Sequence, residues 1–263
     1  MVKIGGFKIA WICAIFWEEP YVGVTYRSCL SDNFSNNMNA NKVVKQVISK
    51  KRVADYGEVY TAEQEVSAML DLVKNETERI ESRFLEPACG NGNFLAPILE
   101  RKLVIVKKKY GSSQLEFERM TFLAVSSVYG VELLQDNIEA CIERLYNIFN
   151  DVYEKLYKDK CKDEFRTSIC FVLKRNILQG DALTLKINDG KEYIIFSEWS
   201  LVNGGMIKRR DFQYAELADF DPKTPTLFSL REVSDMGEAV FSPMPVKEFP
   251  LVHYLSLNYE DAK

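Results

Sequence analysis

The feature that most constrains this chain is a turn with two glycines, placed between an apolar run and a helical pattern. The turn lies within the segment Phe84-Leu85-Glu86-Pro87-Ala88-Cys89-Gly90-Asn91-Gly92-Asn93-Phe94. Gly90 and Gly92 let the backbone approach a bound ligand that a side chain would block. A strand that ends in an acidic residue, followed by such a turn and a helix, predicts an α/β domain with a ligand site at the turn.

Strand and helix patterns alternate over the central part of the chain. Helices are predicted over about 62–79, 94–103, 114–125, 136–156 and 165–173, the first with a capping box from Thr61 to Gln64. Short apolar strands are predicted over about 82–86, 128–133, 176–179 and 193–196. This alternation favours a parallel, doubly wound sheet, in which ligands bind at the carboxyl ends of the strands.

The two ends of the chain differ from this central pattern. Residues 1–40 contain a short apolar run at 9–17 and a polar, turn-prone stretch at 31–37. We interpret 1–40 as a leader outside the fold, with translation beginning at Met38, because the run is too short to span a membrane and no small-residue cleavage site follows it. Residues 41–205 form the predicted ligand-binding domain, and the proline-containing residues 206–263 form a predicted irregular tail.

Charge and composition narrow the classes of partner. The 263 residues carry a net charge of −4, so no overall positive field attracts nucleic acid, and any DNA contact must be local or supplied by a partner. Six cysteines form no C-x-x-C pair and His253 is the only histidine, which argues against a metal site. Cys141 and Cys170 lie on apolar helical faces, as reduced thiols of a cytoplasmic protein do.

Four elements, taken in order, resemble a known family of enzymes. They are Tyr60-Thr61 before a helix, the turn from Glu86 to Gly92, the strand end Gly130-Val131-Glu132, and Gly180-Asp181-Ala182-Leu183. Their order over about residues 51–200 resembles the S-adenosyl-L-methionine (SAM) dependent N6-adenine DNA methyltransferases, especially the modification subunits of restriction systems. The resemblance implies a Rossmann-like class I methyltransferase fold with SAM as cofactor.

The resemblance also implies a role for each element. Tyr60 and Thr61 meet the methionine carboxylate, Glu132 takes the ribose hydroxyls, and Asp181 accepts the adenine amine. The cofactor-binding residues implied are Tyr60, Thr61, Glu86, Pro87, Ala88, Gly90, Asn91, Gly92, Asn93, Phe94, Glu132, Asp181, Ala182 and Leu183. Carboxylates suit these roles, because hydroxyls and amines donate hydrogen bonds and the cofactor carries positive charge near Glu86. The separation between the turn and Glu132 is about twice that of dinucleotide-binding folds, which argues against NAD.

Two departures from the family bear on catalysis. In the family, the fourth strand ends in Asn or Asp, two prolines and an aromatic residue, which hold the flipped target base. Here the predicted strand at 193–196 continues into Ser197-Glu198-Trp199-Ser200, so Ser197 and Glu198 are the candidates for altered catalytic roles. Only 58 residues follow Gly205, and they show no pattern for the family's remaining three strands or its target-recognition domain.

Three functions remain compatible with these residues. The first is a methyltransferase of the N6-adenine DNA type that depends on a partner specificity or methylase subunit for DNA recognition. The second is a catalytically silent SAM-binding subunit or sensor that acts through a partner. The third is a methyltransferase for RNA, protein or a small molecule. Because the family's fourth motif is lost, we expect the isolated chain to transfer no methyl group to DNA.

Overall fold

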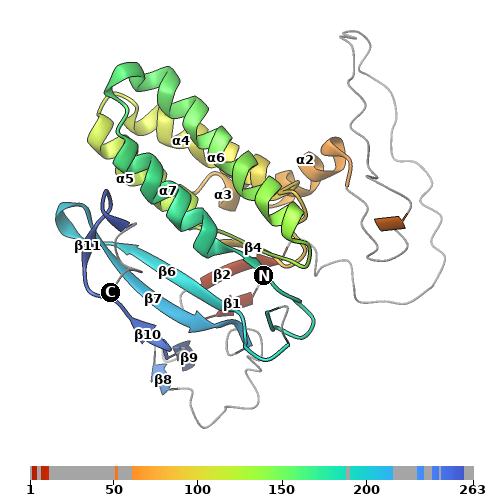
Figure 1. Ribbon diagram of the computed structural model, residues 1–263. Helices are drawn as coiled ribbons and strands as arrows, with labels where there is room; N and C mark the ends of the chain where they lie inside the picture. Colours follow the sequence, from red (N-terminus) through yellow and green to blue (C-terminus); the bar gives the residue numbers. More distant parts are fainter. Residues whose placement is uncertain are drawn as a thin grey trace.

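The structure of the chain, a computed structural model, has an α/β fold (Figure 1). It describes residues 2–4, 7–11, 51–52, 61–187, 190–215, 230–233, 239–242 and 244–257. The central strands are β3 (Phe84–Glu86), β4 (Val128–Glu132) and β5 (Ile177–Gln179), which pair in parallel in that order. The sequence predicted all three of these strands, to within about two residues.

The same sheet extends past β3 on its other side. Strand β2 (Phe7–Trp11) pairs in parallel with β3, and β1 (Val2–Ile4) pairs antiparallel with β2. Both strands fall within residues 1–40, which the sequence suggests to be a leader outside the fold, so part of that segment belongs to the sheet. The remainder of 1–40 lies outside the described residues.

Within the described range 61–187, six α-helices precede or connect the parallel strands. They are α2 (Glu63–Leu72), α3 (Lys74–Thr77), α4 (Leu95–Tyr110), α5 (Gln114–Ser126), α6 (Gln135–Tyr157) and α7 (Asp163–Asn176). The predicted capping box is wrong: α2 begins after Ala62, and no side chain caps it. The helices pack with Phe84, Val128 and Ile177 in one core cluster, so they cover one face of the sheet.

A second sheet, which is antiparallel, covers the other face of the parallel strands. Strand β6 (Ile195–Leu201) pairs with β7 (Met206–Gln213), and β10 (Lys247–Glu248) and β11 (Val252–His253) pair with β7. Leu85, Tyr129 and Val131 pack against Phe196 and Phe212 in a second core cluster. Strand β6 also packs directly on the helical layer, because Trp199 contacts Phe122 of α5 and Phe171 of α7. Figure 1 shows β6 and β7 below these two helices. Within the described residues, strands occupy the face where a doubly wound sheet carries its second layer of helices.

This arrangement corrects two sequence-based predictions. The fourth strand, predicted at 193–196, belongs to an antiparallel hairpin and not to the parallel sheet. The hairpin reverses direction through the short helix η3 (Asn203–Gly205), where Gly204 and Gly205 adopt φ values of 72° and 81°. The predicted irregular tail also contains regular structure, because β7, β10, β11 and the pair β8 (Leu230–Val233) and β9 (Ala239–Ser242) all lie within 206–263.

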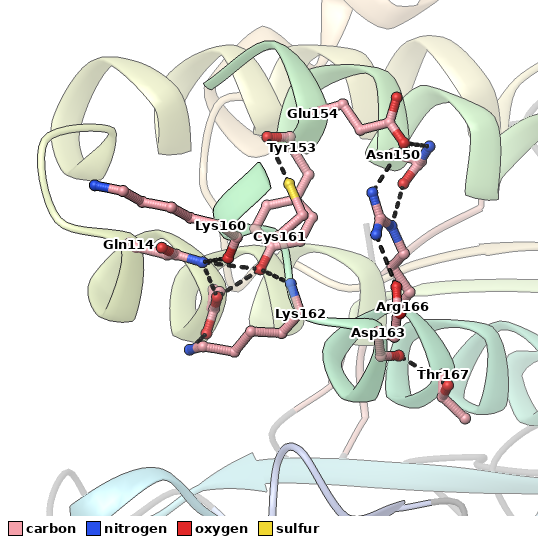
Figure 2. A network of polar contacts seen from close by, with 11 residues as sticks. Gln114, Asn150, Tyr153, Glu154, Lys160, Cys161, Lys162, Asp163, Arg166 and Thr167 are labelled. Carbon is pink, nitrogen blue, oxygen red and sulfur yellow. Dashed lines mark hydrogen bonds and ion pairs between the residues drawn. The ribbon is translucent and has the colours of Figure 1, made fainter. Parts of the chain in front are cut away.

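A polar network fixes the helical layer to the end of the described chain. The buried carboxylate of Glu118 accepts hydrogen bonds from Tyr153 (2.6 Å), Tyr254 (2.7 Å), Lys162 (2.7 Å) and Gln114 (2.9 Å). Figure 2 shows Gln114, Tyr153 and Lys162 of this network next to η2 (Lys158–Lys160), and a second network centred on Arg166. Because Tyr254 directly follows β11, Glu118 joins α5, α6 and the C-terminal strands.

Candidate functional site

The residues that sequence analysis singled out meet at the carboxyl ends of the parallel strands. Glu86 ends β3 and is level with Gly130, while Glu132 ends β4 and is level with Gln179 at the end of β5. The chain then continues directly into Gly180 and Asp181. Parallel pairing therefore places the Glu86, Glu132 and Asp181 segments on one edge of the sheet, as the sequence predicted.

The glycine turn is held tightly against neighbouring elements. Gly90 and Gly92 adopt positive φ values of 52° and 83°, a region that L-residues with side chains rarely occupy. A Cβ atom on Gly92 would lie 2.9 Å from Cys141 Sγ, and one on Gly130 would lie 2.8 Å from Cys89 Sγ. The two cysteine side chains thus fill the space next to the turn. Neither Gly92 nor Gly130 can gain a side chain without displacing a sulfur atom.

Glu132 connects the turn to the next strand. Its Oε2 accepts a hydrogen bond from the Gly90 backbone N–H (2.9 Å), and its Oε1 accepts one from the Leu134 N–H (3.0 Å). The Cys89 N–H also donates to the Val131 carbonyl (3.0 Å). A carboxylate has about four lone-pair positions, so Glu132 keeps acceptor capacity for a ligand while two backbone donors fix its orientation.

Two buried polar groups lie in the segment that follows β3. Glu86 is only 3% exposed, and its Oε1 accepts a hydrogen bond from the Ala88 N–H (3.3 Å). The Oδ1 atom of Asn91 is buried and has no hydrogen-bond partner among the residues that the structure describes. Native proteins satisfy nearly all such atoms, so an orphaned acceptor in a glycine turn points to a ligand donor.

The segment before α2 also reaches the turn. The Asn93 side-chain amide donates to the Thr61 carbonyl (2.7 Å), which brings two predicted site residues together. Pro87 and Ala88 complete the turn, and Phe94 is buried immediately before α4. Tyr60 lies outside the described residues.

Asp181 organises the loop after β5. Its Oδ1 accepts from the Leu183 N–H (2.8 Å) and its Oδ2 from the Thr184 hydroxyl (3.1 Å). Ala182 packs at the edge of the second core cluster, whereas the Leu183 side chain is 76% exposed. Leu133, which follows Glu132, is 45% exposed. Each of these exposed leucines lies within two residues of a carboxylate that the sequence predicted for the site.

The structure does not bring Ser197 and Glu198 to this edge. The Ser197 hydroxyl donates to Asp211 Oδ1 (2.7 Å), and both residues are buried. Glu198 forms ion pairs with Arg83 (2.8 Å) and Arg210 (2.5 Å). Arg83 precedes β3, whereas the glycine turn follows it, so Glu198 lies toward the opposite end of that strand. These contacts give both residues a structural role in the hairpin.

Sequence reasoning missed Tyr214 and Cys141. Cys141 lies in an apolar stripe that indicates only a core position, and its contact with Gly92 depends on how α6 packs. Tyr214 directly follows β7 and carries no local motif. Burial raises the pKa of Tyr214 to about 12, and the nearby Glu86 carboxylate adds to the shift. The sequence contains no signal that places Tyr214 near Glu86, because their relation depends on how the hairpin folds over the sheet.

Comparisons with known proteins leave the site to be interpreted from its own geometry. A scan against protein-family models, a search of curated proteins and a search of solved structures found no match. No group of three or more His, Cys, Asp and Glu side chains in the described part of the chain could hold a metal ion. None of the helices that the structure describes has both the length and the hydropathy required to cross a membrane.

Proposed function

We propose that the chain binds SAM at the carboxyl edge of β3, β4 and β5, and that it is a class I methyltransferase related to the N6-adenine DNA enzymes of restriction-modification systems. The observation that carries the proposal is the 2.9 Å contact between the Gly90 N–H and Glu132. It joins the turn after one strand to the acid at the end of the next. Nucleotides bind outside the carboxyl ends of adjacent parallel strands in such folds, which is where this contact lies.

The topology of the parallel strands supports a nucleotide site. Strand β3, helices α4 and α5, strand β4, helices α6 and α7, and strand β5 form a β-α-β-α-β unit with adjacent parallel strands. Such a unit is one mononucleotide-binding half of a Rossmann-like fold. We propose that the methyltransferase fold is represented here by this half, with the antiparallel sheet in place of a second helical layer.

The chemistry of the edge fits each part of SAM. Glu132 has lone pairs for the two ribose hydroxyls, and Asp181 has lone pairs for the adenine amine. Leu133 and Leu183 offer apolar surface to the adenine ring, and the orphaned Asn91 Oδ1 offers an acceptor to a ligand donor. Glu86 supplies negative charge beside the cationic methionine part. When bound, SAM supplies an electrophilic methyl group on a sulfonium ion.

Methyl transfer to DNA is proposed to need a partner. Holding a target base beside the methyl group requires an orienting clamp, and orientation contributes on the order of 7–11 kcal/mol to such reactions. Of the two sequence candidates for this work, Glu198 pairs with Arg83 before the other end of β3, and the Ser197 hydroxyl donates to Asp211 within the hairpin. A specificity or methylase subunit that supplies both the clamp and the DNA contacts would complete the enzyme.

The buried contacts of Ser197 and Glu198 favour a second candidate, a catalytically silent SAM-binding subunit or sensor. In that case the ion pairs of Glu198 serve only the hairpin, and SAM occupancy regulates binding to a partner protein. The two candidates differ in one result. Purified chain, labelled SAM and unmethylated DNA should give no labelled DNA in either case, whereas adding the partner subunit should give labelled DNA only if the chain belongs to a split methyltransferase.

Titration calorimetry with SAM tests the cofactor proposal itself. Asp181→Ala should weaken SAM binding by about 1–3 kcal/mol, because the adenine amine loses its acceptor. Thr184→Val is the matched control, since it removes a contact within the same loop and keeps the carboxylate. Glu198→Ala should leave SAM affinity nearly unchanged. Failure of folded wild-type protein to bind SAM would refute the proposal.

A further inference from the structure

Tyr214 is buried between the two sheets. It directly follows β7, its backbone N–H donates to the Ile194 carbonyl (2.8 Å), and its side chain is 1% exposed. The ring packs edge-on against Phe196, with 5.2 Å between the ring centroids. It belongs to the second core cluster together with Leu85, which precedes Glu86 in β3. The hairpin therefore carries Tyr214 to the end of the sheet where the glycine turn begins.

The Tyr214 hydroxyl has no hydrogen-bond partner among the residues that the structure describes. A second tyrosine of the same cluster, Tyr129, provides a comparison, because its buried hydroxyl donates to the Ser197 carbonyl at 2.9 Å. Buried hydroxyl groups in native proteins are nearly always paired, and an unpaired one destabilises the fold. Tyr214 thus resembles a group whose partner arrives with a ligand.

The neighbouring charge indicates which ligand group this is. The Glu86 carboxylate is buried at the end of β3, directly after Leu85 of the same cluster. Burial raises the pKa of the Tyr214 hydroxyl, and the charge of Glu86 raises this pKa further. A phenol oxygen and a carboxylate are both acceptors, and a primary ammonium group has three N–H donors that can bond to several acceptors at once. An ammonium group would also offset the buried negative charge of Glu86.

We propose that Tyr214 is a positioning residue of the SAM site, and that its hydroxyl accepts a hydrogen bond from the α-ammonium group of the ligand's amino-acid part beside Glu86. The inference rests on the proposed function and adds a group from the antiparallel sheet to the site. It defines the ligand class as a nucleoside that carries an α-amino acid. Nucleosides without that part do not use the Tyr214 hydroxyl.

Two nucleosides that differ in the amino-acid part test the assignment. S-adenosylhomocysteine carries it, whereas 5′-methylthioadenosine keeps the adenine, ribose and sulfur without it. Tyr214→Phe should weaken S-adenosylhomocysteine binding by about tenfold to a hundredfold in calorimetric titrations, as expected for a hydrogen bond to a charged group. The affinity of the Tyr214→Phe variant for 5′-methylthioadenosine should equal that of wild type. Tyr129→Phe, the matched control, should change the ratio of the two affinities by less than about twofold.

Thermal unfolding without ligand gives a second readout. Tyr214→Phe removes an unpaired hydroxyl and should melt at or above the wild-type temperature, whereas Tyr129→Phe breaks a formed hydrogen bond and should melt below it. Equal effects of Tyr214→Phe on both nucleosides, or no effect on either, would overturn the role of Tyr214 while wild-type binding upholds the SAM site. If wild-type protein bound neither nucleoside, the proposed function itself would fail.

Discussion

Replacing Glu132 by glutamine should loosen the glycine turn even without a ligand. The carboxylate accepts one hydrogen bond from Gly90 and one from Leu134, at 2.9 and 3.0 Å. Glutamine keeps one acceptor oxygen and places an NH₂ group opposite the other backbone N–H, so one charge-assisted hydrogen bond is lost. Such a bond contributes about 1.5–3 kcal/mol. Since Glu132 is partly exposed, water can reach the freed N–H, and we expect a loss of about 2 kcal/mol in the free energy of unfolding.

Urea unfolding followed by circular dichroism measures this loss. Glu143→Gln, an exposed change in α6, is the control for removing one negative charge and should unfold at nearly the wild-type urea concentration. Hydrogen exchange of the Gly90 amide should quicken in Glu132→Gln relative to that control, because this amide loses its acceptor. Equal stability of Glu132→Gln and Glu143→Gln would show that the carboxylate does not hold the turn.

Three further predictions follow from buried groups. Burial lowers the pKa of the Lys102 ammonium to about 7, against the opposing pull of Glu81 and Glu76. The folded protein therefore favours the neutral amine, and the unfolded chain binds more protons at any pH between about 7 and the usual lysine pKa. Stability rises with pH in this range and is lost again as the pH falls, so between about pH 7 and pH 9 wild type should gain about 2 kcal/mol of stability in urea titrations relative to Lys102→Met. Burial would raise the pKa of Glu118, but hydrogen bonds from Lys162, Tyr153, Tyr254 and Gln114 hold it below its usual value, so wild type should lose more stability than Glu118→Gln as acid titration passes below about pH 4.5. A hydrogen bond with Cys141 and, to a smaller extent, burial raise the pKa of the Cys89 thiol well above its usual value. Because only the thiolate reacts, mass spectrometry should find Cys89 alkylated by iodoacetamide only after unfolding.

The parallel strands and their acidic ends could be predicted from the sequence because the evidence is local. Leu85 and Glu86 before the glycines, and Val131 and Glu132 before a helix, each combine a short apolar run with a terminal carboxylate. Parallel pairing then places these ends together whatever the details of packing. The positive φ values of Gly90 and Gly92 give a backbone reason for glycine at both positions, while the approach of a ligand to the turn stays a prediction.

Strand β7 could not be predicted, because its buried face is partly charged. Ile207, Arg209 and Asp211 point inward, and Arg209 donates two hydrogen bonds of 2.9 Å to the Asp211 carboxylate. Arg209 also lies over the Phe249 ring, 4.0 Å from its centroid. An alternation of apolar and polar residues is therefore absent, although the strand is well buried. Without β7 in view, residues 193–196 were assigned to the parallel sheet.

The apolar run at 9–17 shows a related difficulty. A short, unbroken apolar segment near a chain end has no periodicity that distinguishes a leader from a strand of a parallel sheet. The position of β2 beside β3 depends on pairing between residues far apart in the sequence. Tyr214 poses the same problem, since its relation to Glu86 exists only once the hairpin is folded over the sheet.

A crystal structure with S-adenosylhomocysteine tests the central claim most directly. The account predicts the ribose hydroxyls on Glu132, the adenine amine on Asp181, and the adenine ring against Leu133 and Leu183. It also predicts the α-ammonium group between Glu86 and the Tyr214 hydroxyl. A ligand bound away from the carboxyl ends of β3, β4 and β5, or an edge that stays empty at saturating concentrations of S-adenosylhomocysteine, would contradict the account.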